Sequence, residues 1–119
     1  MDIEQARARA LAKPGAVEDA PFAEDVPVYK VGGKIFMIAH IAPPHSVNLK
    51  CDPERAIELR ERHDWITPGY HMNKRHWNTV ELAGAIDDRE IEALIDHSYE
   101  LVFKSLKKSA REEIAGRDR

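Results

Sequence analysis

The 119-residue sequence predicts a two-layer α+β fold, an antiparallel sheet of about five strands with helices on one face. Two observations carry this prediction. Helix-spaced apolar residues and β-rich runs follow one another in the order α-β-β-β-α-β-β-α. Gly32-Gly33 separates two of the β-rich runs, and a glycine pair in that place favours a two-residue hairpin between antiparallel strands. The chain has the length of a single domain, and we expect residues 1–119 to form one.

The beginning of the sequence predicts one helix and a loop. Apolar residues recur at helical spacing over residues 3–12, Asp2 is placed to cap them, and Lys13-Pro14-Gly15 ends the pattern. Residues 14–25 are rich in proline, glycine and acids. We expect a loop there, with Phe22 as its anchor to the core.

Three strands are predicted next, over residues 26–31, 34–41 and 46–51. Pro27 places the first strand at a sheet edge or marks its beginning, because proline cannot donate a ladder hydrogen bond. The third run alternates between apolar and polar residues, so we expect one set to face the core and the other to face away. The apolar set is Val47, Leu49 and Cys51, and the polar set is Ser46, Asn48 and Lys50.

A second helix and two more strands are predicted in the following segment. Asp52-Pro53 is typical of a helix start, with the aspartate as N-cap and the proline in the first helical position. Strands are expected over residues 65–72 and 76–82, joined around Asn73-Lys74-Arg75.

The last helix is predicted over residues 88–106, and the charged residues 107–119 are predicted to fray. Two patterns mark its start, a capping box of Asp87 with Glu90 and a hydrophobic staple of Ile86 with Ile91.

The single cysteine, Cys51, excludes an intramolecular disulfide and favours a reducing compartment. Its place on the apolar side of its strand predicts a buried, unreactive thiol. The N-terminus is charged from the second residue and lacks a signal-peptide core, and no apolar run reaches the roughly 20 residues that span a bilayer. We expect a cytoplasmic protein with no membrane partner.

Charge is unevenly distributed along the chain. The formal net charge is -3, but residues 26–51 and 65–80 contain basic residues and no acid. Local potential rather than net charge steers an anionic ligand, so these stretches predict a basic surface on the sheet. Their bases are Lys30, Lys34, Lys50, Lys74 and Arg75, and four histidines, His40, His45, His71 and His76, lie among them.

Residues 68–79 combine cations, amides and aromatic rings in about a dozen positions. Cations attract phosphates, amides reach base edges or phosphate oxygens, and aromatic rings stack on bases. The alternative is that Tyr70 and Trp77 belong to the core and that the charges form a solvated turn. The candidate nucleic-acid contacts are Lys30, Lys34, Lys50, His71, Asn73, Lys74, Arg75, His76, Trp77 and Asn78.

Catalytic and metal chemistry are weakly indicated. His71 and His76 lie five residues apart, and two histidines across a hairpin can face one ion, but no zinc-binding signature is present. For Ser98 we expect a hydroxyl bonded to a carbonyl of its own helix. No glycine-rich phosphate loop joins a strand to a helix. We therefore expect no metal, no cofactor and no enzymatic activity.

Six short stretches together carry a family resemblance: residues 13–16, 21–22, 30–36, 48–53, 68–80 and 96–102. On these stretches the chain resembles the MmcQ/YjbR family of small bacterial proteins, over residues 10–106. The resemblance implies a CyaY-like or secretion-chaperone-like α+β fold. It also implies DNA binding through a double-wing arrangement of β-hairpins.

The expected function is a monomeric DNA-binding module that contacts phosphates with a basic sheet and hairpin surface. The alternative is a protein-interaction or chaperone-like module that receives a peptide on the free sheet face or on an edge strand.

Overall fold

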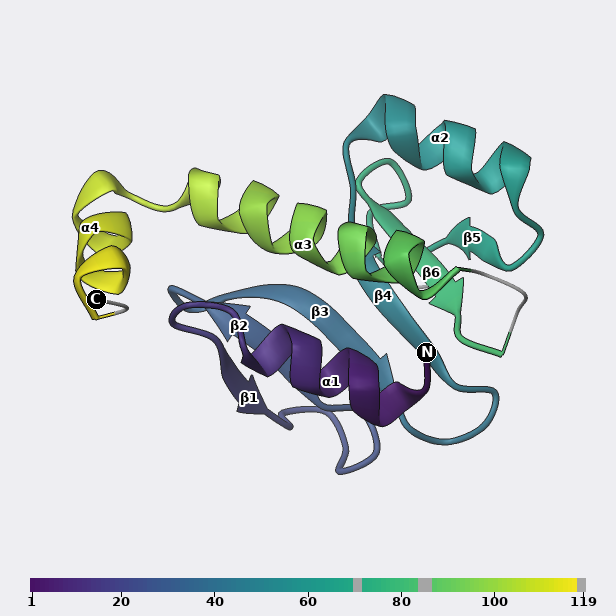
Figure 1. Ribbon diagram of the computed structural model, residues 1–119, viewed down its shortest axis with the longest axis horizontal. Coiled ribbons are helices and arrows are strands. Elements are labelled where there is room, and N and C mark those ends of the chain that lie inside the picture. Colours follow the sequence, from purple (N-terminus) through teal and green to yellow (C-terminus); the bar gives the residue numbers. More distant parts are fainter. Residues whose placement is uncertain (70–71, 84–86, 118–119) are drawn as a thin grey trace.

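An antiparallel sheet of six strands organises the residues that the computed structural model describes, 1–69, 72–83 and 87–117 (Figure 1). The strand order is β1-β2-β3-β4-β6-β5. The strands are β1 (Val17–Asp19), β2 (Val28–Val31), β3 (Lys34–His40), β4 (Ser46–Lys50), β5 (Ile66–Pro68) and β6 (Trp77–Glu81). The helices are α1 (Ile3–Leu11), α2 (Pro53–Arg62), α3 (Asp88–Ser105) and α4 (Lys108–Arg117). The predicted fold class is confirmed.

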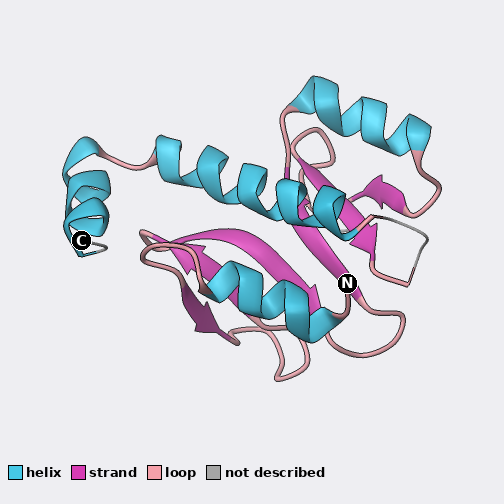
Figure 2. Ribbon diagram, in the orientation of Figure 1, coloured by secondary structure: helices cyan, strands magenta, loops and turns pink. Residues whose placement is uncertain are grey.

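The two faces of the sheet differ. Residues from all four of these helices share one hydrophobic core with Val47, Leu49 and Val80 of the sheet, and Figure 2 shows α1 and α3 side by side across the strands. The alternate positions Asn48 and Lys50 are absent from this core. The apolar set Val47, Leu49 and Cys51 lies in the core as predicted, but Ser46 and Asn48 of the polar set are also buried, at 8% and 4% exposed. We call the face without helices the open face.

A β-bulge at Phe36 interrupts the alternation of inward-facing and outward-facing side chains in β3. Tyr29 pairs with Met37 and Lys30 pairs with Ile35, so Phe36 is an extra residue with no partner on β2. Phe36 and Met37 are both fully buried in the core, because a bulge turns two successive side chains toward one face.

The glycine pair forms the predicted tight turn between β2 and β3. Gly32 and Gly33 have φ values of 57° and 80°, the left-handed region that primed hairpin turns require. Gly32 also lies beneath Leu106, where a Cβ would be 2.6 Å from Leu106 Cδ1.

Three predictions about the ends of the chain are wrong. Residues 14–25 include the short strand β1, whose three residues are all exposed and so carry no burial pattern. Phe22 is 66% exposed and does not anchor that segment. The C-terminal segment forms α4 rather than fraying, and its Ile114 packs on Gly15.

The helix starts follow the sequence signals with one exception. Asp2 and Gln5 form a reciprocal capping box, and the Asp52 carboxylate accepts from the Arg55 amide at 3.2 Å. Asp87 caps α3 through the Arg89 amide at 3.0 Å. The predicted box with Glu90 is wrong, because its carboxylate contacts His63 Nε2 at 3.0 Å instead. Ile86, the other half of the predicted staple, lies outside the described residues.

Ser98 connects α3 to the sheet. Its hydroxyl donates to the Phe36 carbonyl oxygen at 2.5 Å and accepts from the Lys50 amide at 2.8 Å. The expectation of a bond to a carbonyl of its own helix is wrong. This side chain leaves the helix and reaches two strands.

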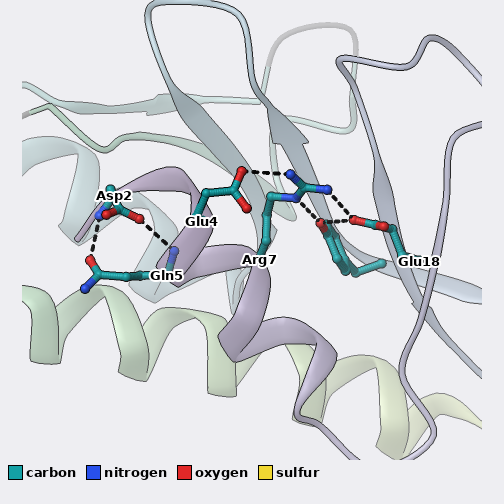
Figure 3. A network of polar contacts seen from close by, with 6 residues as sticks. Asp2, Glu4, Gln5, Arg7 and Glu18 are labelled. Carbon is teal, nitrogen blue, oxygen red and sulfur yellow. Dashed lines mark hydrogen bonds and ion pairs between the residues drawn. The ribbon is translucent and has the colours of Figure 1, made fainter.

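A polar network attaches α1 to the edge of the sheet (Figure 3). Arg7 contacts Glu4 and Glu18 at 2.8 Å each and donates through Nε to the Tyr29 hydroxyl at 2.8 Å. Hydrogen bonds from Tyr29 and Arg7 hold the pKa of Glu18 below its ordinary value. The short, exposed strand β1 is thereby attached to α1.

A second ion cluster joins α1 to α3. Asp96 accepts from Arg9 Nη2 at 2.7 Å and also pairs with Lys13. Burial alone would raise the pKa of Asp96, but its bonds to Arg9 and Lys13 outweigh burial and lower it.

Of the helices in the described part of the chain, none has the length and apolar content needed to cross a membrane.

Candidate nucleic-acid interface

Residues 72–76, which lead into β6, form a turn held by hydrogen bonds of the backbone. The Gly69 amide donates to the Trp77 carbonyl oxygen at 2.8 Å, and the Trp77 amide donates to the Asn73 carbonyl oxygen at 3.0 Å. The Asn73 side chain accepts from the Arg75 amide at 3.0 Å, a bond typical of an Asx turn. Lys74 and Arg75 are exposed at the tip. Their backbone is ordered while their side chains remain available.

Arg60 on α2 fixes this turn from the helical side. Its Nη1 donates to the Lys74 carbonyl oxygen at 3.0 Å, and its Nε donates to the Ala56 carbonyl oxygen at 3.2 Å. Sequence analysis did not single out Arg60. Its role depends on where α2 lies relative to the turn, and no local pattern encodes that position.

The turn is continuous with the end of β4. Lys50 and Trp77 are directly opposed across β4 and β6, and both are half-buried on the open face. The Cys51 amide donates to the His76 carbonyl oxygen at 2.7 Å and extends the contact beyond the strands. Trp77 is neither in the hydrophobic core nor packed against it. Trp77 is thus partly buried, and the alternative that it is a core residue is wrong.

The exposed turn and its neighbours form a surface at the end of β4 and β6, to which Lys50 and Trp77 contribute from the open face and Arg60 from the helical side. We call it the basic turn surface, and its members are Lys50, Arg60, Lys74, Arg75 and Trp77.

A row of polar side chains crosses the open face beside this surface. His40 Nε2 lies 2.6 Å from Asn48 Oδ1, and Asn48 Nδ2 donates to Thr79 Oγ1 at 2.7 Å. The three residues lie on β3, β4 and β6. Asn48 is only 4% exposed, so its carboxamide is held by these partners rather than by water.

Two of the predicted contacts lie elsewhere on the sheet. Lys30 Nζ pairs with Asp19 at 3.3 Å on β1, and Lys34 Nζ donates to Ser105 Oγ at 3.3 Å near the end of α3. In the sheet order, β3 and β4 separate β2 from β6. Lys30 and Lys34 are therefore not part of the basic turn surface.

Asn78 faces the helices and not the open face. It is 2% exposed, and its Nδ2 donates to the Ala56 carbonyl oxygen at 3.4 Å. Its amide is thus enclosed between β6 and α2, away from any external ligand. His71 and Tyr70 lie outside the described residues. The predicted residues that the structure gathers around the turn are Lys50, Asn73, Lys74, Arg75, His76 and Trp77.

Comparison with known proteins decides the family of the chain. The family model described as YjbR matches residues 11–101. The chain belongs to the YjbR family. It is 34% identical over 112 residues to the uncharacterized protein YjbR of Escherichia coli strain K12, covering 93% of this chain and 95% of that protein. It is also 36% identical over 95 residues to the uncharacterized protein YbdF of Escherichia coli O157:H7, covering 79% and 78%.

Solved structures share the YjbR fold described above. The crystal structure of Deinococcus radiodurans protein DR2400, with a domain described as DUF419, matches with a TM-score of 0.89 and 36% identity, covering 95% of this chain and 87% of that chain. A Pseudomonas syringae crystal structure matches with a TM-score of 0.74 and 30% identity, covering 86% and 99%. The family resemblance and its α+β fold are therefore confirmed.

Two side chains of this YjbR-family chain, Cys51 and His97, have pKa values shifted by burial. Cys51 is 3% exposed and burial raises the pKa of its thiol, which confirms the predicted buried cysteine. Burial lowers the pKa of His97, whose Nε2 accepts from the Asp52 amide at 3.2 Å. Among the described residues, no three histidine, cysteine or acidic side chains gather as metal ligands do.

Proposed function

We propose that the chain is a DNA-binding module that contacts phosphates with the basic turn surface. The observation that carries this proposal is the convergence of Lys50, Arg60, Lys74 and Arg75 at one end of the sheet. Within the described ranges, no carboxylate forms an ion pair with any of the four. Cations that the fold does not neutralise are available to phosphate, and an ordered turn presents them without much loss of chain entropy.

The partners of the individual cations indicate which of them are available to bind phosphates. Lys30 would have to leave Asp19 to bind a phosphate, whereas no carboxylate of the described residues pairs with Lys50, Lys74 or Arg75. Arg60 is partly occupied with two carbonyl oxygens. We expect these three cations to neutralise about three phosphates. A plot of the logarithm of affinity against the logarithm of salt concentration should then have a slope of about -3.

Peptide binding at an edge strand is the second candidate. The edge strands β1 and β5 have three residues each, and β5 ends at Pro68, which has no amide hydrogen to donate. Short edges of this kind offer few backbone hydrogen bonds to an added strand, so we rank this function below DNA binding.

Fluorescence anisotropy with a labelled duplex at several salt concentrations tests the proposal. The double variant Lys74→Ala/Arg75→Ala should reduce the magnitude of the salt slope by about two. The matched control is Arg89→Ala/Lys108→Ala, which removes two exposed cations from the helical layer and should leave the slope unchanged. Failure to bind at about 50 mM salt, or equal loss in both variants, would contradict the proposal and favour the peptide-binding alternative.

A further inference from the structure

The open face carries an aromatic ring beside a cation. Trp77 is opposed by Lys50 on β4, while its neighbour on the β5 side is Gly69, which has no side chain. A Cβ on Gly69 would lie 2.9 Å from Trp77 Cβ, so the glycine permits the close approach of the two strands. Across β4 the half-buried Trp77 thus faces Lys50, and on the β5 side Gly69 itself contributes no side chain beside it.

The polar row next to Trp77 has a defined direction. Asn48 Nδ2 donates to Thr79 Oγ1, so Asn48 Oδ1 is the acceptor and His40 Nε2 must donate to it. The Thr79 hydroxyl accepts one bond and keeps its own proton for a further acceptor. Thr79 lies two residues from Trp77 on the same strand and the same face. A hydrogen-bond donor is therefore placed beside the aromatic ring.

Charge is also arranged along this face. Lys50 is opposite Trp77 and the exposed Lys74 and Arg75 lie in the turn just before it, while Glu81, the acid of the same strand, lies at the opposite end and pairs with Ser46 in the register. Asp19 is on β1, at the far edge of the sheet, and is already paired with Lys30. An anionic chain lying over Trp77 would meet cations first.

We propose that the open face binds an unpaired stretch of DNA, with one base stacked on Trp77 and adjacent phosphates on Lys50, Lys74 and Arg75. This inference rests on the proposed function and specifies its ligand. In a duplex both faces of each base are covered by neighbouring bases. The Trp77 ring would therefore find no exposed base face on which to stack. In a single strand the base faces are accessible, and the stacking of bases on aromatic side chains tolerates any sequence.

The inference is tested by measuring the binding of three labelled oligomers of about 12 nucleotides at about 50 mM salt. The oligomers are oligo(dT), the duplex of oligo(dT) with oligo(dA), and oligo(U). Oligo(dT) should bind about tenfold more tightly than the duplex. Trp77→Leu should weaken oligo(dT) binding about tenfold and duplex binding less than about twofold, whereas Trp77→Phe should retain most of the affinity. The phenylalanine variant keeps a stacking ring, so a general effect on folding would not spare it.

Intrinsic fluorescence gives a direct readout because the chain has two tryptophans. Trp65→Phe leaves Trp77 as the single tryptophan, and under tryptophan-selective excitation oligo(dT) should quench its emission. Trp77→Phe leaves Trp65, which is stacked on His63 with ring centroids 4.0 Å apart, and its emission should not change. Duplex binding without preferential oligo(dT) binding or quenching would overturn this inference and leave the proposed function standing. Absence of binding to any oligomer would overturn both, and tighter binding of oligo(U) than oligo(dT) would overturn the assignment to DNA.

Discussion

The Phe36 carbonyl and the Lys50 amide are joined through the hydroxyl of Ser98, which donates to the first at 2.5 Å and accepts from the second at 2.8 Å. The register that pairs Met37 with Leu49 would place Phe36 and Lys50 opposite each other in the next position. The bulge at Phe36 ends the ladder there, and a side chain of α3 supplies the missing connection.

Removal of this hydroxyl should destabilise the protein. Ser98→Ala leaves a buried carbonyl and a partly buried amide without this partner, and we expect a loss of about 2 kcal/mol in the free energy of unfolding. Ser105→Ala is the control, since that exposed hydroxyl bonds to Val102 within the helix and its loss should cost less than about 0.5 kcal/mol. Urea unfolding of both variants measures the difference. Equal stabilities would show that the sheet closes without Ser98.

The two hairpin glycines allow steric and backbone costs to be separated. Gly32→Ala places a Cβ against Leu106 and Gly33→Ala places one in open space, but both residues have positive φ. We expect Gly33→Ala to cost about 1 kcal/mol from backbone strain and Gly32→Ala to cost about 1 kcal/mol more. Thermal unfolding provides the comparison. In a Leu106→Ala background the difference between the two variants should shrink, and a difference that persists would refute the steric explanation.

Arg60 should control the order of the turn. Arg60→Met removes the donors to the Lys74 and Ala56 carbonyl oxygens, and amide hydrogen exchange at His76 and Trp77 should accelerate as the turn opens more often. Arg60→Lys should not restore protection, because an ammonium lacks the planar fork that reaches two carbonyls. Arg62→Ala, an exposed position on the same helix, is the control. Unchanged exchange in Arg60→Met would mean that the backbone bonds of the turn suffice.

The cluster at Asp96 should make stability depend on acid pH. Its pKa is lowered in the folded state, so its contribution is present above the unfolded pKa of about 4 and is lost as pH falls through the folded pKa. Asp96→Asn should cost about 1 kcal/mol at pH 7, because the cluster is partly exposed. Below about pH 4 the variant should lose stability less steeply than the native chain. Chemical denaturation across this range gives both curves, and parallel curves would rule out the assignment.

Cys51 should react only when the fold opens. Burial both encloses the thiol and raises its pKa, so little thiolate is present at neutral pH. A thiol reagent should label it slowly in buffer and at the rate of a free cysteine in denaturant. Fast labelling of the native chain would show that the end of β4 opens locally.

Local signals made much of this fold predictable. The Gly32-Gly33 turn and the apolar set of β4 that faces the core are encoded in a few neighbouring residues, and both were confirmed. Three-residue β1 has no buried position to create a pattern, and Ile114 of α4 packs on Gly15 near the other end of the chain. Such contacts join residues far apart in sequence.

Some residues of the candidate site were predictable from local sequence, and others depend on contacts between distant segments. Lys74 and Arg75 were predicted as phosphate contacts from the composition of residues 68–79. Their exposed side chains agree with the predicted turn. Asn78 has the same chemistry as a base-reading amide, but the register of β6 turns it toward α2. Arg60 and Ser98 act through partners on other elements, so their roles depend on tertiary structure that no short segment contains.

The hydrogen bonds that hold the β5–β6 turn involve the main chain at position 74 and the amide at position 75, and neither side chain takes part. Substitutions at these two positions should therefore leave the turn geometry intact. The pair is thus a natural place to diversify: a library varied at positions 74 and 75 alone would sample new ligand preferences on an unchanged scaffold.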